Sequence, residues 1–305
     1  MEHPKKVIIV VVNWDAKNVL EECLHSYKKI DYSNYDVIVV DNGSKDGSQQ
    51  MVKTLFPEFT VIELGKNYGV AEGQNVGIRH ALEMGFDYLF ISNNDVMCNE
   101  NMLKELLHCM ESDPSIGIAS PLVYYYDAPE IIQLGGAMID WDHATTSLLY
   151  NGQKDTEFPA CLDIDYHGFL LISHNTIIRT GLYDPEYFAY WEDVDFCVRV
   201  KKLGLRIVCL KNAKVWHKVS FTTRRITGFF EYYMTRNRMY FMKKYSTDAR
   251  FFKFYFYLFS YDIGHTVYVH LVKHKSAKLL FCYFKGFLNG LILCARSVKY
   301  QPFKG

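Results

Sequence analysis

The stretch VIIVVVNWDAKN at residues 7–18 opens with six consecutive apolar residues and then turns polar. A Val- and Ile-rich run of this length is typical of a strand buried on both faces. Similar runs follow at 37–40, 60–64 and 88–92. Helical patterns lie between and after these runs, at about 16–29, 47–55, 71–84 and 99–111. Because strands alternate with helices, we predict an α/β fold with a doubly wound sheet.

The middle of the chain has a shorter periodicity than this first part. Apolar and polar residues alternate from about 116 to 172, which predicts further strands, some antiparallel, that build one face of a cleft. A helix is expected at about 174–180 and a second at 192–203, ending before Gly204. The apolar stretch RIVCLKNAKVWH at 206–217 is expected to form a late strand.

The 305 residues carry no formal net charge, yet the charge is unevenly distributed. Residues 226–305 contain 13 of the 34 Lys and Arg residues and three acids, which leaves +10 there and −10 in residues 1–225. The same eighty positions hold 22 of the 44 Phe and Tyr residues. We therefore divide the chain into residues 1–225 and a basic, aromatic-rich helical region at 226–305.

The cysteines and the N-terminus bear on the cellular compartment. Eight cysteines are scattered without a C-x-x-C pair, so neither a zinc site nor a disulfide framework is indicated, and a reducing compartment fits best. The first apolar run is too short for a signal peptide and has no small-residue cleavage site after it. We expect a cytoplasmic protein.

The segment SAKLLFCYFKGFLNGLILCARSVK at 276–299 is an apolar helix with one narrow polar stripe. Lys285 interrupts it, as Lys253 and Asp262 interrupt an earlier aromatic segment, so we expect neither to span a membrane. Helices that lie in the interface, with aromatic side chains among acyl chains and lysines on headgroups, fit better. A buried helical subdomain or a dimer interface is the alternative, so an oligomer is compatible with the sequence.

Polar residues stand where the predicted parallel strands end, which is where such sheets bind ligands. Asp95 ends ISNNDV, and its carboxylate suits a hard cation that would hold diphosphate oxygens, although Asn94 and Asp95 also suit a turn and a helix cap. Asp41 in VVDNGSKDGS can accept from a nucleotide base or a ribose, or can belong to an ordinary turn. Gly69 and Gly73 precede a helix whose amides can approach a sugar or phosphate, but close packing explains them equally well.

The chain has no G-x-G-x-x-G after its first strand and no G-x-x-x-x-G-K-[ST] motif. A dinucleotide-dependent oxidoreductase and a P-loop enzyme are therefore disfavoured. A lone histidine such as His217, at the end of AKVWH, is more often a packed or surface residue than a ligand.

The stretch AYWEDVDFCVR at 189–199 concentrates three carboxylates behind a group of aromatic residues. Glu192 and Asp193 are expected in the first turn of a helix, where free amides and the macrodipole stabilise negative charge. A cap does not explain the aromatic residues beside them. An apolar surrounding raises the pKa of a carboxyl group towards neutrality, as a catalytic base requires.

Taken in order, these motifs resemble the family-two inverting glycosyltransferases with the GT-A fold, especially the rhamnosyl- and galactofuranosyltransferases. The motifs are Asn13-Trp14, DNGSKDGS, NYGVAEGQNVGI, NND, GLYDPEYFAYWEDVDFCVR, VWH and YMTRNRMYF, and they cover residues 5–245. The resemblance implies a mixed sheet with a Rossmann-like nucleotide-binding half, an acceptor half and a C-terminal helical region. The usual D-x-D is Asn93-Asn94-Asp95 here, so the first acid is missing.

The resemblance also implies roles for individual residues. Asp193 would be the general base, supported by Glu192, and Mg²⁺ or Mn²⁺ would be held by Asp95 and His217. Acceptor contacts would come from Trp191 and Asp195. The donor would be bound by Asn13, Asp41, Asn67, Gly73, Asn75, Asn94 and Arg236, with Asp41 at the nucleotide base. Apart from the resemblance, Arg236 and Arg238 in TRNR can neutralise diphosphate, although a basic helix face is the plainer account.

We therefore expect a hexosyl- or deoxyhexosyltransferase that passes a sugar from a nucleotide-diphosphate sugar, with inversion, to a hydroxyl of a glycan or lipid-linked acceptor. The acceptor would be met at the cytoplasmic face of the membrane, and no nucleic-acid partner is expected. A nucleotidyltransferase on a similar sheet is one alternative, but VVNWDAKN is not its glycine-rich, arginine-containing loop. A degenerate protein that only binds glycan or membrane is the other, because the metal motif lacks an acid.

Overall fold

The computed structural model describes residues 4–218 and 226–296. Its first part alternates strands with helices, and the predicted elements are found within a few residues of their expected bounds. These elements are β1 (Val7–Asn13), α1 (Lys17–Tyr27), β2 (Tyr35–Asp41), α2 (Ser48–Leu55), β3 (Thr60–Glu63), α3 (Gly69–Met84), β4 (Tyr88–Asn93), β5 (Val96–Cys98) and α4 (Met102–Ser112).

The second part contains the shorter strands that the alternation predicted. They are β6 (Ile116–Tyr125), β7 (Ile132–Leu134), β8 (Ala137–Asp140), β9 (Thr145–Leu148), β10 (Cys161–Asp163), β11 (Leu170–Ser173) and β12 (Arg206–His217). The helical elements of this part are η1 (Asp155–Glu157), α5 (His174–Thr180), η2 (Pro185–Tyr187) and α6 (Glu192–Lys202).

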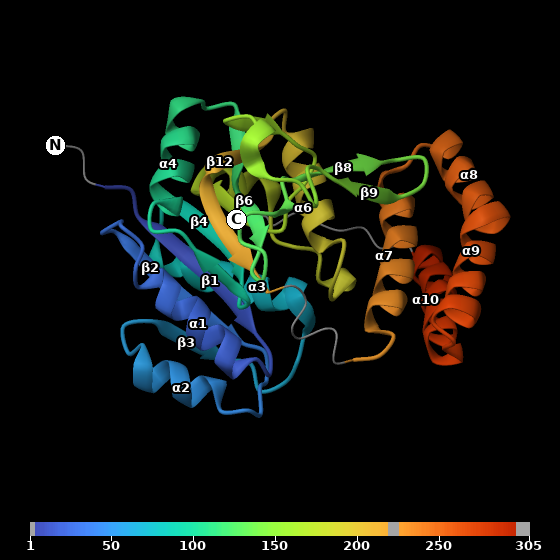
Figure 1. Cartoon of the computed structure of the whole chain (residues 1–305), viewed down its shortest axis with the longest axis horizontal. Coiled ribbons are helices and arrows are strands. Elements are labelled where there is room, and N and C mark those ends of the chain that lie inside the picture. Colours follow the sequence, from blue (N-terminus) through green and yellow to red (C-terminus); the bar gives the residue numbers. More distant parts are fainter. Residues whose placement is uncertain (1–3, 219–225, 297–305) are drawn as a thin grey trace.

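Ten strands form one mixed sheet, in the order β10-β12-β6-β11-β4-β1-β2-β3, with β5 on β12 and β7 on β6. The strands β4, β1, β2 and β3 run parallel, whereas β11 is antiparallel to both β4 and β6. The expected α/β class and mixed sheet are thus confirmed. The carboxyl ends of the parallel strands β1, β2 and β4 lie at the same edge of the sheet (Figure 1).

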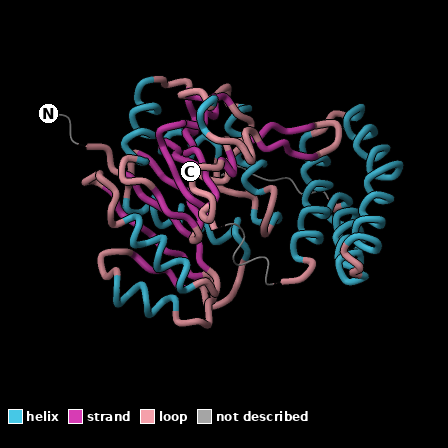
Figure 2. Tube along the Cα trace, in the orientation of Figure 1, coloured by secondary structure: helices cyan, strands magenta, loops and turns pink. Residues whose placement is uncertain are grey.

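Helices cover both faces of the sheet, so its strands are buried on both sides (Figure 2). Successive residues of β1 enter different cores, because side chains alternate across a strand. Ile9 belongs to the core under α1, α2 and α4, whereas Val10 packs with α3. Gly77 of α3 is required for this packing, since an added Cβ would lie 2.3 Å from a methyl of Val10.

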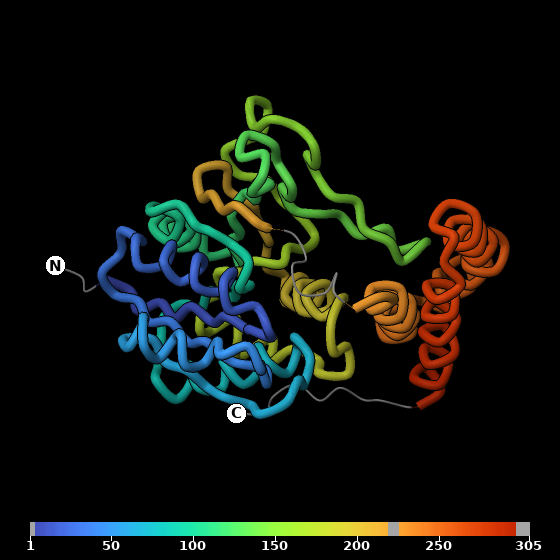
Figure 3. Tube along the Cα trace, turned by 60° about the horizontal axis from the view of Figure 1, so that its bottom comes forward, coloured from blue at the N-terminus to red at the C-terminus, as the bar shows by residue number. Residues whose placement is uncertain are grey.

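The C-terminal helical region is present and stands at one end of the molecule (Figures 1 and 3). It comprises α7 (Phe229–Tyr245), α8 (Asp248–Tyr257), the π-helical segment η4 (Leu258–Asp262), α9 (Ile263–Tyr268), the π-helical segment η5 (Val269–Lys273) and α10 (Ala277–Ala295). The β8–β9 hairpin reaches towards these helices (Figure 3).

One apolar cluster joins the helical region to the rest of the chain. Phe241 of α7 packs with ring centroids 4.9 Å from Trp191 at the start of α6, and Phe254 of α8 is buried in the same cluster. Helix α10 packs along α7, where Gly286 approaches the backbone of Tyr232 so closely that a Cβ would lie 2.4 Å from its carbonyl oxygen. The predicted boundary at residue 225 lies outside the described residues.

Helix α10 differs from expectation in one respect. It is long and apolar enough to cross a membrane, with a mean hydropathy of 1.4, and only 22% of the segment tested is buried in the protein. Lys285 therefore does not exclude a span by length and composition, because one interior lysine lowers the average hydropathy too little, and the expected position in the membrane interface stays a prediction. Those two criteria alone do not establish a span, since core helices also meet them.

Candidate functional site

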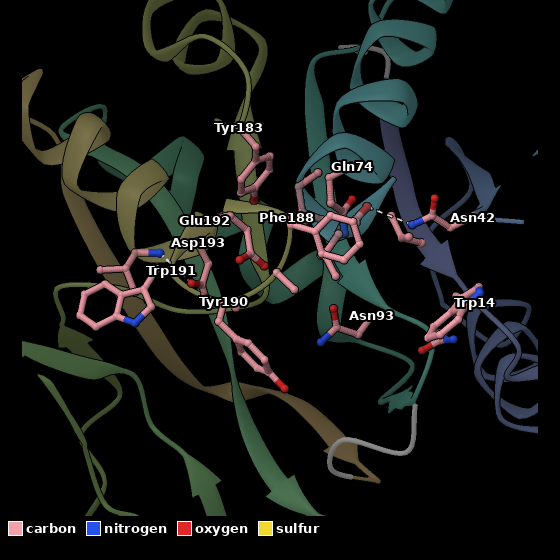
Figure 4. A pocket seen from close by; sticks show the side chains of 18 of the residues that line it. Trp14, Asn42, Gln74, Asn93, Tyr183, Phe188, Tyr190, Trp191, Glu192 and Asp193 are labelled. Atoms are coloured by element: carbon pink, nitrogen blue, oxygen red, sulfur yellow. Dashed lines mark hydrogen bonds between the residues drawn. The ribbon is translucent and has the colours of Figure 1, made fainter. Parts of the chain in front are cut away.

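A cavity of about 370 Å³ lies at the carboxyl ends of β1, β2 and β4. Trp14 and Asn42 lie on one side and Glu192 and Asp193 on the opposite side, with Phe188 and Asn93 between them (Figure 4). The volume is within the range of about 300–1,000 Å³ typical of small-molecule sites.

Asp95 and His217 meet at this cavity although they are far apart in the sequence. Asp95 lies in the turn between β4 and β5, and β5 pairs antiparallel with β12 so that Val96 is opposite His217. The register brings His217 Nε2 to 3.0 Å from Asp95 Oδ1, and both residues line the cavity. The pairing of β5 with β12 therefore creates this contact.

The surroundings of His217 fit a cation at this position. His217 Nδ1 is 2.9 Å from Gln133 Oε1 and, when Nδ1 carries the ring proton, donates to that oxygen. In the neutral ring Nε2 then presents a lone pair to the Asp95 carboxylate, and only a proton or a cation reconciles two acceptors at 3.0 Å. The residues described include no group of three His, Cys, Asp or Glu side chains suited to a metal. A cation here would need substrate oxygens as further ligands, as Mg²⁺ commonly does.

Glu192 and Asp193 begin α6, as predicted, and both line the cavity. Their helix has no side-chain cap, because Trp191 occupies the N-cap position. Burial, followed by the neighbouring Asp193 charge, raises the pKa of Glu192 to about 8. Burial also raises the pKa of Asp193 to about 6, although the Val194 amide donates to its Oδ1 at 2.7 Å. The pair can exchange protons near neutral pH.

Asp195 does not reach the cavity, which corrects its expected contact with the acceptor. Its carboxylate is buried and ion-paired to Arg199 at 2.8 Å and to Lys244 of α7 at 2.6 Å. Burial raises its pKa, but Arg199 and Lys244 outweigh burial and hold the pKa below its usual value. Tyr187 and Tyr245 hydroxyls donate to the same carboxylate. The residue joins α6 to the C-terminal helices.

The segment before α6 is held in an unusual backbone conformation. Phe188, Tyr190 and Trp191 have φ values of 63°, 65° and 71°, a region that side chains other than glycine rarely adopt. Such a conformation persists only where its surroundings enforce it. We refer to residues 187–191 as the catalytic loop, because Glu192 and Asp193 follow it directly.

Two distant segments hold the catalytic loop. The amides of Val70 and Ala71, in the first turn of α3, donate to the Phe188 carbonyl at 2.6 and 3.3 Å. Gly69 allows this approach, since a Cβ there would lie 2.5 Å from that carbonyl oxygen. From α7, the Asn237 amide donates to the carbonyls of Tyr187, Ala189 and Tyr190 at 2.9, 2.8 and 2.7 Å.

Asn13 and Asp41 form a buried network beneath the cavity and do not line it. Asn13 Nδ2 lies 3.3 Å from Asp41 Oδ1, and the other oxygen of Asp41 accepts from Ser44 and Gln49. Asn94 donates to Asn13 Oδ1 at 2.7 Å, so the network supports a residue that does line the cavity. The expected contact of Asp41 with a nucleotide base stays a prediction.

Three other predicted donor-binding residues contact neighbouring protein groups. Gly73 packs against Val12, to which an added Cβ would approach within 2.9 Å. Asn75 accepts from the Tyr183 amide at 2.8 Å and donates to its carbonyl at 2.9 Å. Arg236 donates to the carbonyls of Glu186 and Tyr187. None of the three lines the cavity as the structure describes it.

The cavity therefore brings together seven of the predicted residues: Asn67, Asn94, Asp95, Trp191, Glu192, Asp193 and His217. The sequence analysis missed Asn42, whose side chain donates to Asn67 Oδ1 at 3.1 Å and to the Gly69 carbonyl at 3.0 Å. Its position directly after Asp41 at a strand end was an available signal. It also missed Gln74, which lies within the quoted stretch NYGVAEGQNVGI, and Tyr166, which no motif marks; both line the cavity.

The chain belongs to glycosyl transferase family 2, whose profile matches residues 7–174, more than half of its length. It is therefore a glycosyltransferase, an enzyme that takes a sugar from a nucleotide-sugar donor. The resemblance stated from the motifs is confirmed, and the nucleotidyltransferase alternative finds no support.

Curated relatives match this chain over most of their own length. A dTDP-rhamnosyl transferase, RfbF of Shigella flexneri, is 25% identical over 251 residues, covering 78% of this chain and 79% of the relative. An N-acetylglucosaminyl-diphospho-decaprenol L-rhamnosyltransferase of Mycobacterium tuberculosis is 24% identical, covering 71% and 77%. Galactofuranosyltransferase GlfT1 of Mycolicibacterium smegmatis is 25% identical, covering 67% and 68%.

Solved structures share the fold at low identity. Residues 1–349 of S. aureus TarS, in complex with UDP-GlcNAc, superpose with a TM-score of 0.59 at 15% identity, covering 95% of this chain and 81% of that fragment. The mannosyltransferase PcManGT of Pyrobaculum calidifontis, in complex with GDP-Man and Mn²⁺, gives a TM-score of 0.57 at 14% identity, covering 98% and 77%. These likenesses support the GT-A type of sheet.

Proposed function

We propose that this glycosyltransferase transfers a hexose or deoxyhexose, with inversion, to a hydroxyl group of a glycan or lipid-linked acceptor, with Asp193 as the general base. The proposal depends chiefly on one observation: Asp193 and the Asp95–His217 pair line the same cavity. A base for the acceptor and a site for the leaving diphosphate are the two groups that inverting transfer needs.

In this mechanism Asp193 takes the proton of the acceptor hydroxyl as its oxygen attacks the anomeric carbon of the donor. The bond from that carbon to the diphosphate oxygen breaks on the opposite side, which inverts the configuration. A pKa of about 6 leaves Asp193 ionised at neutral pH and still basic enough to share a proton in the transition state. Phe188 and Tyr190 line the cavity and would exclude water that competes with the acceptor.

Asp95 and His217 would hold Mg²⁺ or Mn²⁺, and the cation would neutralise charge on the departing diphosphate. Their 3.0 Å contact, with His217 Nδ1 engaged by Gln133, supports this assignment. Asn93 stands where the first acid of D-x-D is usual, so the site carries one negative charge less and is expected to bind the free cation weakly. The neighbouring structure of PcManGT contains Mn²⁺, which is consistent with a divalent ion.

The amide side chains at the strand ends are suited to the uncharged part of the donor. Asn42, Asn67 and Asn94 line the cavity on the side of β1 and β2. Amide groups offer both donors and acceptors, which suits a nucleobase edge or a ribose. Asp41 would act indirectly, since its hydrogen bonds to Asn13 and Ser44 fix the network on which Asn94 depends.

The test of the proposed function is transfer itself. The protein is incubated with Mn²⁺ and a panel of labelled nucleotide-diphosphate sugars, and release of nucleotide diphosphate is followed with and without glycan acceptors. NMR of the product then gives its anomeric configuration. Acceptor-dependent release with an inverted product is expected. Binding of a nucleotide sugar without release in any condition would favour the degenerate, non-catalytic alternative.

We also propose that the C-terminal helices contact the membrane at its cytoplasmic face. Large apolar side chains there are strongly exposed: Phe252 by 73%, Phe256 by 76%, Phe281 by 67% and Leu288 by 59%. Exposed apolar surface of this extent marks an interaction site. The +10 charge of residues 226–305 opposes packing of a second copy and favours an anionic surface. A peripheral contact would bring the cavity to lipid-linked acceptors.

A further inference from the structure

A second cavity, of about 320 Å³, shares Trp191 with the one described above. Trp191, Thr146 and Met234 line both cavities, so the two are contiguous. Its remaining walls come from α7, from the helices between 258 and 273, from α10 and from the β8–β9 hairpin. The helical region and the catalytic half therefore build it together.

The walls of this second cavity carry polar groups that have hydrogen-bonding capacity left. Arg238 is ion-paired with Asp262 at 3.0 Å, and the Tyr283 hydroxyl donates to the other oxygen of Asp262 at 2.9 Å. The Nε of Arg238 and the Nδ1 of His270 are buried, with no hydrogen-bond partner among the residues that the structure describes. His270 is itself 92% buried, from an exposed fraction of 8%.

Such groups destabilise the folded chain if the cavity binds no ligand. Buried donors and acceptors without partners destabilise the folded chain, and a buried ion pair is often less stable than apolar residues of the same volume. A ligand that supplies hydroxyl groups would satisfy Arg238, Asp262 and His270 at once. Trp191, Phe230 and Tyr283 add apolar faces, and the mixture of carboxylate, guanidinium and aromatic surface suits a sugar ring.

The position of the cavity indicates which sugar it would take. Donor-side groups, such as Asn67 and the Asp95–His217 pair, line the first cavity and are absent from the walls described for the second. Trp191 lines both cavities and directly precedes Glu192 and Asp193, so a ligand in the second cavity would contact the residue next to this pair of acids. The lining contains two acids, Glu231 and Asp262, and one permanently charged base, Arg238. When His270 is neutral the lining therefore carries one more negative charge than positive, which disfavours a diphosphate.

We propose that this second cavity is an acceptor subsite for an uncharged sugar unit, located between the catalytic loop and the C-terminal helices. The inference depends on the proposed function, because "acceptor" has a meaning only if transfer occurs at Asp193. It assigns Thr266, His270 and the Arg238–Asp262 pair to recognition of the acceptor, and it makes the helical region a determinant of specificity.

The test measures binding separately from transfer. Uncharged methyl glycosides of glucose, galactose, rhamnose and N-acetylglucosamine are titrated by calorimetry and by tryptophan fluorescence into the whole protein. Thr266→Met fills the cavity, His270→Leu removes one polar group, and Val267→Met is the matched control on the same helix outside the cavity lining. Thermal melting checks that each variant is folded, and donor binding is measured in parallel.

We expect at least one glycoside to bind the natural chain and to bind Thr266→Met at least fivefold more weakly, with His270→Leu reduced and Val267→Met and donor affinity unchanged. Glycoside binding that is equal in Thr266→Met, or absent throughout, overturns the inference. Competition by inorganic diphosphate in place of glycosides overturns the assignment to a neutral sugar. If glycosides bind at this cavity while no donor is ever cleaved, the proposed function fails, and the cavity is a sugar-binding site without an acceptor role.

Discussion

The pH dependence of transfer distinguishes Asp193 from Glu192 as the base. With a pKa of about 6, Asp193 is roughly 9% ionised at pH 5 and roughly 91% at pH 7. The kcat/KM for the acceptor should therefore rise roughly tenfold between pH 5 and pH 7 and then level off. A base with the pKa of about 8 that Glu192 has would give the same rise between pH 7 and pH 9.

Two variants complete this prediction. Asp193→Asn keeps the size of the side chain but cannot take a proton, so we expect transfer to fall roughly 10²-fold or more while nucleotide-sugar affinity is kept. Glu192→Gln should keep the rise near pH 6, because burial is the first cause of the raised pKa of Asp193. Rates are measured as nucleotide-diphosphate release at saturating donor and Mn²⁺. If kcat/KM instead rises near pH 8, and Glu192→Gln removes that rise, the assignment of Asp193 as the base is refuted.

The same pKa values predict the direction in which folding stability changes with pH, and this change serves as a control. Both acids bind protons more tightly in the folded chain than in the unfolded one, so folding stability is highest below about pH 4 with respect to this pair and falls as pH rises through about 6 and 8. Glu192→Gln removes one of the two charges. It should raise the melting temperature more at pH 8.5 than at pH 5, and an equal change at both pH values would contradict the raised pKa.

Three further results are expected. Asn237→Ala removes the donor to three carbonyls of the catalytic loop and should lower the free energy of unfolding, measured by urea denaturation, by roughly 2–4 kcal/mol. The control Asn289→Ala breaks one hydrogen bond to a hydroxyl and should lower it by less than about 1.5 kcal/mol. Equal losses would mean that the loop does not depend on this contact. Asp95→Asn should abolish the Mn²⁺ enhancement of nucleotide-diphosphate affinity in calorimetry, and an unchanged enhancement would exclude Asp95 as a ligand. Replacing Phe252 and Phe256 by Ser should reduce sedimentation with anionic vesicles at least severalfold while melting is unchanged, and undiminished sedimentation would refute the interfacial contact.

The sequence predicted the parallel half of the sheet well, because buried strands and amphipathic helices have strong local patterns. It could not predict the contact of Asp95 with His217 from spacing, since that contact depends on the pairing of β5, a strand of three residues, with β12. The resemblance to a family supplied it instead. Short strands carry little pattern of their own, so their partners are set by tertiary packing.

The spacing of the acids in the stretch 192–195 contained information that the prediction for Asp195 did not use. Asp195 lies two positions after Asp193 and hence about 200° around the helix, so the two carboxylates had to face different surroundings. Helical periodicity alone indicated that they do not share one site. That Asp195 pairs with Lys244, by contrast, depends on how α7 packs, and the second cavity likewise depends on segments that meet only in the folded chain.

The two supports of the catalytic loop bear on the order in which the protein becomes competent during synthesis. Gly69 and Val70 precede the loop by more than a hundred positions, whereas Asn237 follows it by about fifty. A nascent chain that ends near residue 218 has the whole sheet and both acids, but lacks the amide that closes the left-handed turns. We therefore expect the sheet to fold early and the loop to lock only when α7 has emerged, so that arrested chains should bind nucleotide before they can transfer sugar.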